Sequence, residues 1–90
     1  MNNLFFSYEA KSENEDQISK AIESLGNSTK LHTSCWYVNS KASAEEALKV
    51  IARFLTEEDT LVISDTTNNT SAWFNIEEKR EIRVKQNWRL

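Results

Sequence analysis

A carboxylate at the tip of a strand-like segment is the first group in this sequence that could do chemistry. Glu9 closes the run Leu4-Phe5-Phe6-Ser7-Tyr8, whose aromatic and apolar residues predict a strand over residues 3–9. There it could bind Mg²⁺ or Mn²⁺ for phosphodiester cleavage, and with its copy in a second chain it could form a carboxylate pair. The simpler interpretation, which we favour, is a solvated carboxylate at a strand end or beside a helix N-terminus.

The only histidine and the only cysteine are the next candidates. His32 could be a general base or a metal ligand, but the chain has no second histidine and no Cys-x-x-Cys pair, so we expect no zinc site. Cys35 has no partner for an internal disulfide, and no basic residue in sequence reach would activate its thiol. We predict a surface histidine, a buried structural cysteine, and no cofactor unless nuclease chemistry recruits Mg²⁺ or Mn²⁺.

Aromatic side chains beside cations could stack on nucleic-acid bases. Only the segment Lys85-Gln86-Asn87-Trp88-Arg89 combines the two, so Lys85, Trp88 and Arg89 are predicted to contact nucleic acid or another partner. For Trp36 and Trp73 we expect packing in the core or in a dimer interface.

Acidic side chains lie on or near both predicted helices: Glu13, Glu15, Asp16, Glu23, Glu45 and Glu46. On a shared outer face they could imitate DNA phosphates, although ordinary helix solvation explains the same residues. Residues 1–74 carry 6 basic and 11 acidic side chains, a balance of −5, while residues 75–90 carry 5 and 3, a balance of +2. The body should therefore repel nucleic acid on average, whereas the tail could tolerate it.

Length and composition limit the architecture. The 90 residues, 39% of them hydrophobic, predict a single domain (residues 1–90) whose small core a homodimer would help to stabilise. We find neither a basic segment leading into an apolar stretch nor a long apolar run, so we expect a cytoplasmic protein with no membrane partner.

Hydrophobic periodicity predicts strands and helices in alternation. The first helix places Ile18, Ala21, Ile22 and Leu25 on one face and ends at Gly26, and the second begins at the capping box Ser43-Ala44-Glu45-Glu46. The predicted strands span residues 3–9, 29–33, 34–39 and 60–64, with a further short strand at 72–74.

Two regions need special geometry. Residues 29–33 and 34–39 are predicted to meet in a bulge or tight bend near Thr33-Ser34. Residues 77–90 fit neither period well and are predicted to be extended with a helical or frayed end, in a C-terminal extension (75–90) that a dimer could swap. The order predicts an α+β, ferredoxin-like βαββαβ sandwich: an antiparallel sheet, two helices on one face and a short extra C-terminal strand.

These segments resemble the Cas-two-like proteins and their SinR-like relatives. The run from Leu4 to Glu9 resembles their first strand, which usually reads apolar-apolar-x-Tyr-Asp, and Ser34-Cys35-Trp36-Tyr37-Val38 resembles a Ser-x-Trp-x-Val segment. The segments at 43–46, 59–63 and 72–74 match in order and spacing, so the resemblance covers about residues 3–76.

The resemblance implies a ferredoxin-like homodimer whose terminal strands extend the partner's sheet. Some members of the family bridge integrase subunits and contact the DNA backbone in CRISPR adaptation, and some relatives are metal-dependent nucleases that use the aspartate ending the first strand. Glu9 stands in place of that aspartate, and its extra methylene moves the carboxylate by roughly a bond length, which metal-assisted cleavage tolerates poorly.

We therefore expect a non-catalytic homodimer that binds a protein or a protein–nucleic-acid assembly. Two alternatives stay open: a metal-dependent endonuclease that uses Glu9, and an acidic DNA mimic that inhibits a nucleic-acid-binding defence protein, as some phage proteins do.

Overall fold

A four-stranded antiparallel sheet organises the computed structural model, which describes residues 1–11, 13–67 and 78–87. The spatial order of the strands is β2-β3-β1-β4. Their bounds are β1 Asn2–Glu9, β2 Gly26–His32, β3 Cys35–Ser40 and β4 Thr60–Asp65. Three helices accompany the sheet: α1 Glu15–Glu23, α2 Ala44–Ala52 and α3 Glu78–Asn87. The predicted α+β class is confirmed, and the arrangement is consistent with a ferredoxin-like type of fold.

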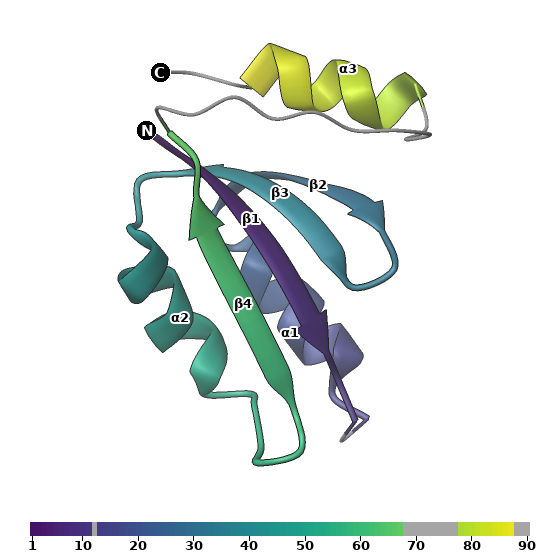
Figure 1. Ribbon diagram of the computed structural model, residues 1–90, viewed down its shortest axis with the longest axis vertical. Coiled ribbons are helices and arrows are strands. Elements are labelled where there is room, and N and C mark those ends of the chain that lie inside the picture. The colour runs from purple at the N-terminus through teal and green to yellow at the C-terminus, as the bar shows by residue number, and fades with distance from the viewer. Residues whose placement is uncertain (12, 68–77, 88–90) are drawn as a thin grey trace.

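The hydrophobic core lies between the sheet and the helices α1 and α2; in Figure 1, α1 lies behind the strands and α2 to the left of β4. Alternate β1 residues Leu4, Phe6 and Tyr8 point to this side, because successive side chains of a strand face opposite ways. They meet the α1 and α2 side chains that recur at helical spacing: Ile18, Ala21, Ile22, Ala47 and Ile51. Trp36 belongs to the same core, as its predicted packing role requires.

The opposite sheet face carries a buried polar group. Asn3 and Tyr37 are both fully buried, and the Tyr37 hydroxyl donates to Asn3 Oδ1 at 2.7 Å. Asn39 Nδ2 donates to the same oxygen at 3.2 Å. Buried polar atoms are costly unless they are hydrogen-bonded, so this shared acceptor holds β1 and β3 in one register.

The start of α2 matches the predicted capping box. Ser43 Oγ accepts from the Glu46 backbone N–H, and Glu46 Oε1 accepts from the Ser43 backbone N–H, each at 3.1 Å. This exchange satisfies two donors that the first helical turn leaves without partners.

Asp59 joins the loop before β4 to the start of α1. Its carboxylate accepts from the backbone N–H groups of Lys11 and Thr56, each at 2.8 Å, and from Asn14 Nδ2 at 3.0 Å. Asn14 Nδ2 also donates to the Phe54 carbonyl just beyond α2. The N-terminal end of α1 therefore lies beside the C-terminal end of α2, and the two helices run antiparallel.

The bend predicted between residues 29–33 and 34–39 is confirmed. Thr33 and Ser34 form the turn between β2 and β3, Ser34 adopts a positive φ of 62°, and the pairing register shifts between Lys30 and His32.

Gly26 differs from its predicted role as the residue that ends the first helix. The helix already ends at Glu23, and Gly26 is the first residue of β2, opposite Ser40. A Cβ at this position would lie 2.1 Å from the Asn39 carbonyl oxygen. Close approach of two strands, rather than helix termination, is what requires glycine here.

Over residues 78–87, the structure corrects the extended conformation predicted for residues 77–90. Residues 78–87 form α3, which buries Val84, lies against β2 and places Lys85 one turn after Glu81 at an Nζ–Oε1 distance of 2.9 Å. One buried residue in two to three turns leaves little apolar periodicity to read, which is why the pattern was ambiguous. The predicted strand at 72–74 lies outside the described residues, as does Trp73. No helix in the described part of the chain is long and apolar enough to cross a bilayer.

Candidate functional site

Glu9 lies at the exposed end of β1. Its Oε1 is 3.2 Å from Lys11 Nζ, and both side chains are more than half exposed. Among the described residues, no group of three or more His, Cys, Asp or Glu side chains could hold a metal ion. Mg²⁺ binds proteins through one or two carboxylates with waters and substrate phosphates, and at Glu9 it would meet a carboxylate that already has Lys11 as a cationic neighbour.

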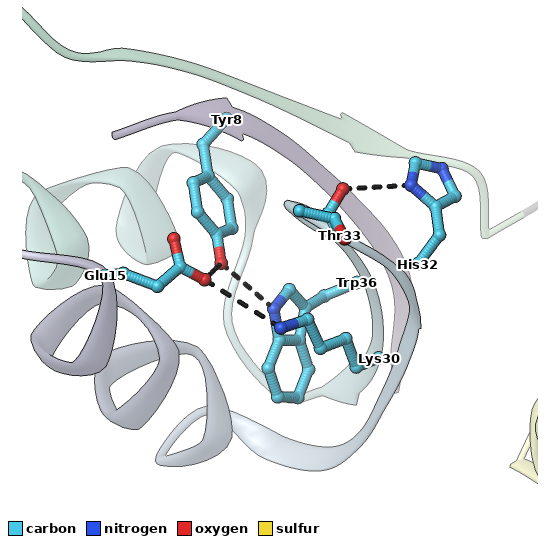
Figure 2. A network of polar contacts seen from close by, with 6 residues as sticks. All are labelled: Tyr8, Glu15, Lys30, His32, Thr33 and Trp36. Carbon is cyan, nitrogen blue, oxygen red and sulfur yellow. Dashed lines mark hydrogen bonds and ion pairs between the residues drawn. The ribbon is translucent and has the colours of Figure 1, made fainter. Parts of the chain in front are cut away.

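A polar cluster around Tyr8, the residue before Glu9, lies on the helix side of the sheet (Figure 2). The Tyr8 hydroxyl donates to Glu15 Oε1 at 2.6 Å and accepts from Trp36 Nε1 at 3.4 Å. Lys30 Nζ lies 3.9 Å from the same Glu15 oxygen. The cluster thus connects β1, α1, β2 and β3 through four side chains.

This cluster acts as a structural tie: its hydrogen bonds hold secondary-structure elements together. Burial, and next the hydrogen bond to Glu15, raise the pKa of Tyr8 above its usual value. The phenol therefore stays protonated at neutral pH and keeps donating to Glu15. A general base would need the opposite shift, so Tyr8 fixes Glu15 and Trp36 in place.

His32 and Cys35 both lie near the β2–β3 turn. His32 is exposed, and its Nδ1 lies 2.9 Å from the Thr33 carbonyl oxygen, away from the Tyr8 cluster in Figure 2. Cys35 is half-buried opposite Ser7, and burial raises the pKa of its thiol. A protonated thiol is a poor nucleophile, in keeping with the structural role predicted for Cys35.

The structure does not gather the predicted acidic residues on one patch. Glu13, Glu15 and Asp16 lie at the N-terminal end of α1, whereas Glu45 and Glu46 lie at the N-terminal end of α2. Because α1 and α2 run antiparallel, these are opposite ends of the helix layer, and Glu23 lies with the second group. Glu15 is also engaged with Tyr8 and Lys30.

A groove with cationic walls separates the two acidic groups. It lies between α1 and α2, encloses about 330 Å³, and is lined by Gln17, Lys20, Ala21, Ser24, Val50, Arg53 and Phe54. Val50 and Phe54 give this groove exposed apolar surface, with 36% and 37% of their surface exposed. Because its charged lining residues are cationic, this groove would favour a partner with an acidic segment and an apolar anchor. It would disfavour the basic surface of a DNA-binding protein, which is the partner that a DNA mimic requires.

The predicted C-terminal contact residues are only partly described. Lys85 lies on α3, where Glu81 neutralises it. Trp88 and Arg89 lie outside the described residues. The α3 surface also presents Lys79, Ile82 and Arg83, and Arg80 Nη1 donates to the Leu31 carbonyl oxygen at 2.9 Å.

An exposed apolar surface surrounds β4, which is an outer strand of the sheet. Within the described residues β4 pairs with β1 on one side and with no strand on the other. On the helix side a groove of about 220 Å³ is lined by Ala44, Glu45, Leu48, Leu61 and Ile63, and Leu48 is 45% exposed. On the opposite side Val62 is 56% exposed. We call this surface, made of β4 and Leu48, the β4 edge.

The apolar triplet in β4 is only partly buried in the structure, although its sequence is typical of a fully buried strand. Three consecutive apolar residues, Leu61, Val62 and Ile63, are typical of a strand covered on both faces. In the structure the core reaches only Leu61 and Ile63, and Val62 faces outward. With Leu48 exposed beside the same strand, the exposed Val62 makes the β4 edge a candidate interaction surface.

No known protein-family model matches this chain, and no curated protein matches it either.

Proposed function

We propose that the chain is a non-catalytic binding protein that acts as a homodimer on a protein or a protein–nucleic-acid assembly. The β4 edge carries this proposal. An outer strand presents backbone donors and acceptors that another chain can pair with, and natural sheets commonly protect such strands with charges, proline or a covering element. Within β4 the only charged residue is the terminal Asp65, and apolar side chains flank both faces.

The clusters of polar side chains support binding rather than catalysis. Glu15, Asp59 and Asn3 each accept hydrogen bonds that connect secondary-structure elements. The Glu9 carboxylate instead forms an exposed ion pair with Lys11. The ferredoxin-like topology and the Cas-two-like family are parts of the same proposal: the strand order, the first strand ending in Tyr8-Glu9 and the buried Trp36 support them.

Measuring the oligomeric state tests the proposed homodimer directly. Light scattering coupled to size exclusion, at chain concentrations from about 1 to 100 μM, should give twice the 10.4 kDa of one chain. A mass of one chain over the whole range would overturn the homodimer.

The groove between α1 and α2 is the surface proposed for the protein partner. Its charge predicts that Lys20→Glu combined with Arg53→Glu weakens capture of the partner by the tagged chain in extracts of the native host. Lys41→Glu is the matched control, since Lys41 is an exposed cation outside this groove. Equal capture by both variants would exclude the groove as the partner site.

A further inference from the structure

The backbone of β4 directs its hydrogen-bonding groups away from β1 at every second residue. The Thr66 N–H donates to the Asn3 carbonyl at 2.8 Å, at the end of the β1–β4 ladder. Hydrogen-bonded pairs alternate along an antiparallel ladder, so Ser64, Val62 and Thr60 also direct their backbone groups toward β1. Tyr8 donates its N–H to Ser34 in the opposite direction, which agrees with this alternation. Leu61 and Ile63 therefore direct their N–H and C=O groups outward.

The side chains of the same residues alternate between the two sheet faces. Leu61 and Ile63 lie half-buried on the helix side, beside Leu48. Val62 lies on the other side, between the small polar side chains of Thr60 and Ser64. A strand added at this edge must match both patterns: outward backbone groups opposite outward ones, and apolar side chains opposite apolar ones.

We propose that the partner at this edge is β4 of a second copy, paired antiparallel about a two-fold axis at Val62. This inference rests on the homodimer proposed above and names its interface. Val62 then lies opposite Val62, and Leu61 of each copy lies opposite Ile63 of the other. Each Leu61–Ile63 pair exchanges both backbone hydrogen bonds, and the two sheets become one continuous sheet.

Neighbouring registers are less favourable. Centring the pair on Ile63 sets Leu61 against the Asp65 carboxylate twice, and centring it on Leu61 moves Ile63 opposite residue 59, which precedes the strand. Any register that pairs Leu61 with Val62 sets an outward residue against an inward one and leaves ladder groups without partners. In the register centred on Val62, Asp65 lies opposite Asp59, whose carboxylate is already directed at Lys11, Asn14 and Thr56.

A pair of lysine substitutions tests this register. Val62→Lys places two like charges directly opposite each other at the two-fold axis, so we expect the dimer dissociation constant to rise at least about tenfold. Ser64→Lys adds the same charge to the same face of the same strand, but opposite Thr60, so we expect a change within about twofold. Circular dichroism of both variants verifies that each chain still folds.

Cysteine cross-linking tests the same register directly. In a Cys35→Ser background, Val62→Cys should form an intermolecular disulfide on mild oxidation, because Cα atoms of such a pair lie about 4.5 Å apart. Ser64→Cys should not, because its two copies are displaced by four residues, about 13 Å along the strands.

The outcomes separate the two proposals. A wild-type dimer in which Val62→Cys cross-links and Ser64→Cys does not supports the register. A wild-type dimer that Val62→Lys leaves intact, or in which Ser64→Cys cross-links instead, overturns the register and leaves the homodimer standing. A wild-type monomer overturns both.

Discussion

At the scale of single residues, Glu9 is the group on which the nuclease alternative depends. Its carboxylate is exposed, and it forms an ion pair with Lys11. Exposed ion pairs contribute little to stability, so Glu9→Ala should change the free energy of unfolding by less than about 0.5 kcal/mol.

The activity assay for Glu9 then has a definite expectation. With Mg²⁺ or Mn²⁺ and labelled RNA or DNA, the wild type and Glu9→Ala should both leave the substrate intact. Cleavage by the wild type that Glu9→Ala abolishes would establish the nuclease and refute the non-catalytic proposal.

The Tyr8 hydroxyl is expected to contribute to stability through its two hydrogen bonds. Tyr8→Phe removes the donor to Glu15 and leaves Trp36 Nε1 without this acceptor, so we expect a loss of about 1–3 kcal/mol in urea unfolding. Ser7→Ala, on an exposed neighbour, is the control and should have little effect. A Tyr8→Phe variant as stable as the wild type would show that the cluster is not a structural tie.

The same hydroxyl should make stability depend on alkaline pH. The pKa of Tyr8 is raised in the folded chain, so folding favours its protonated form. This stabilisation is complete below the unfolded pKa of about 10 and is lost as pH rises through the higher folded value. The unfolding free energy should therefore fall more steeply above a pH of about 10 in the chain that keeps Tyr8 than in the Tyr8→Phe variant. Both chains should carry Cys35→Ser, because the pKa of Cys35 is also raised and its titration would overlap.

At the scale of elements, the start of α2 depends on the Ser43 cap. Ser43→Ala removes the acceptor for the Glu46 N–H and should cost about 1 kcal/mol, whereas Ser43→Thr keeps an acceptor and should retain most of the stability. Thermal unfolding measures both. Equal losses in the two variants would assign the effect to packing rather than to the cap.

Local patterns in the sequence were sufficient to predict most elements. Three of these patterns depend only on residues close in sequence: the capping box at Ser43, the alternating residues of β1, and the apolar face from Ile18 to Ile22. Gly26 and α3 were not predicted correctly, because both depend on distant contacts: the Asn39 carbonyl for Gly26, and β2 for α3.

The candidate site was harder to predict than the elements. Glu9 was readable as an exposed strand-end charge, but the exposure of Val62 was not, since an apolar triplet has the same appearance in a buried strand and in an interface. The acidic residues were identified individually, yet their division between two ends of the helix layer follows only from the antiparallel run of α1 and α2.

At the scale of the whole molecule, a small chain whose outer strand β4 is unpaired on one side among the described residues should owe part of its stability to association. A 90-residue chain buries a limited fraction of its surface, so the proposed dimer couples folding to concentration. The Tm of the wild type should rise with chain concentration between about 1 and 100 μM, and that of Val62→Lys should stay nearly constant. A Tm independent of concentration in the wild type would contradict this coupling.

The buried acceptor on Asn3 has a consequence for misfolding. If β1 slipped by one residue against β3, Asn3 would turn toward the helices, and the donors of Tyr37 and Asn39 would lose their shared acceptor inside the protein. Apolar residues at 4, 5 and 6 would tolerate such a slip far better, since they differ little in hydrophobicity. One amide thus discriminates against off-register pairings that the apolar side chains around it would accept, and Asn3→Leu should broaden the set of compact states the chain can reach.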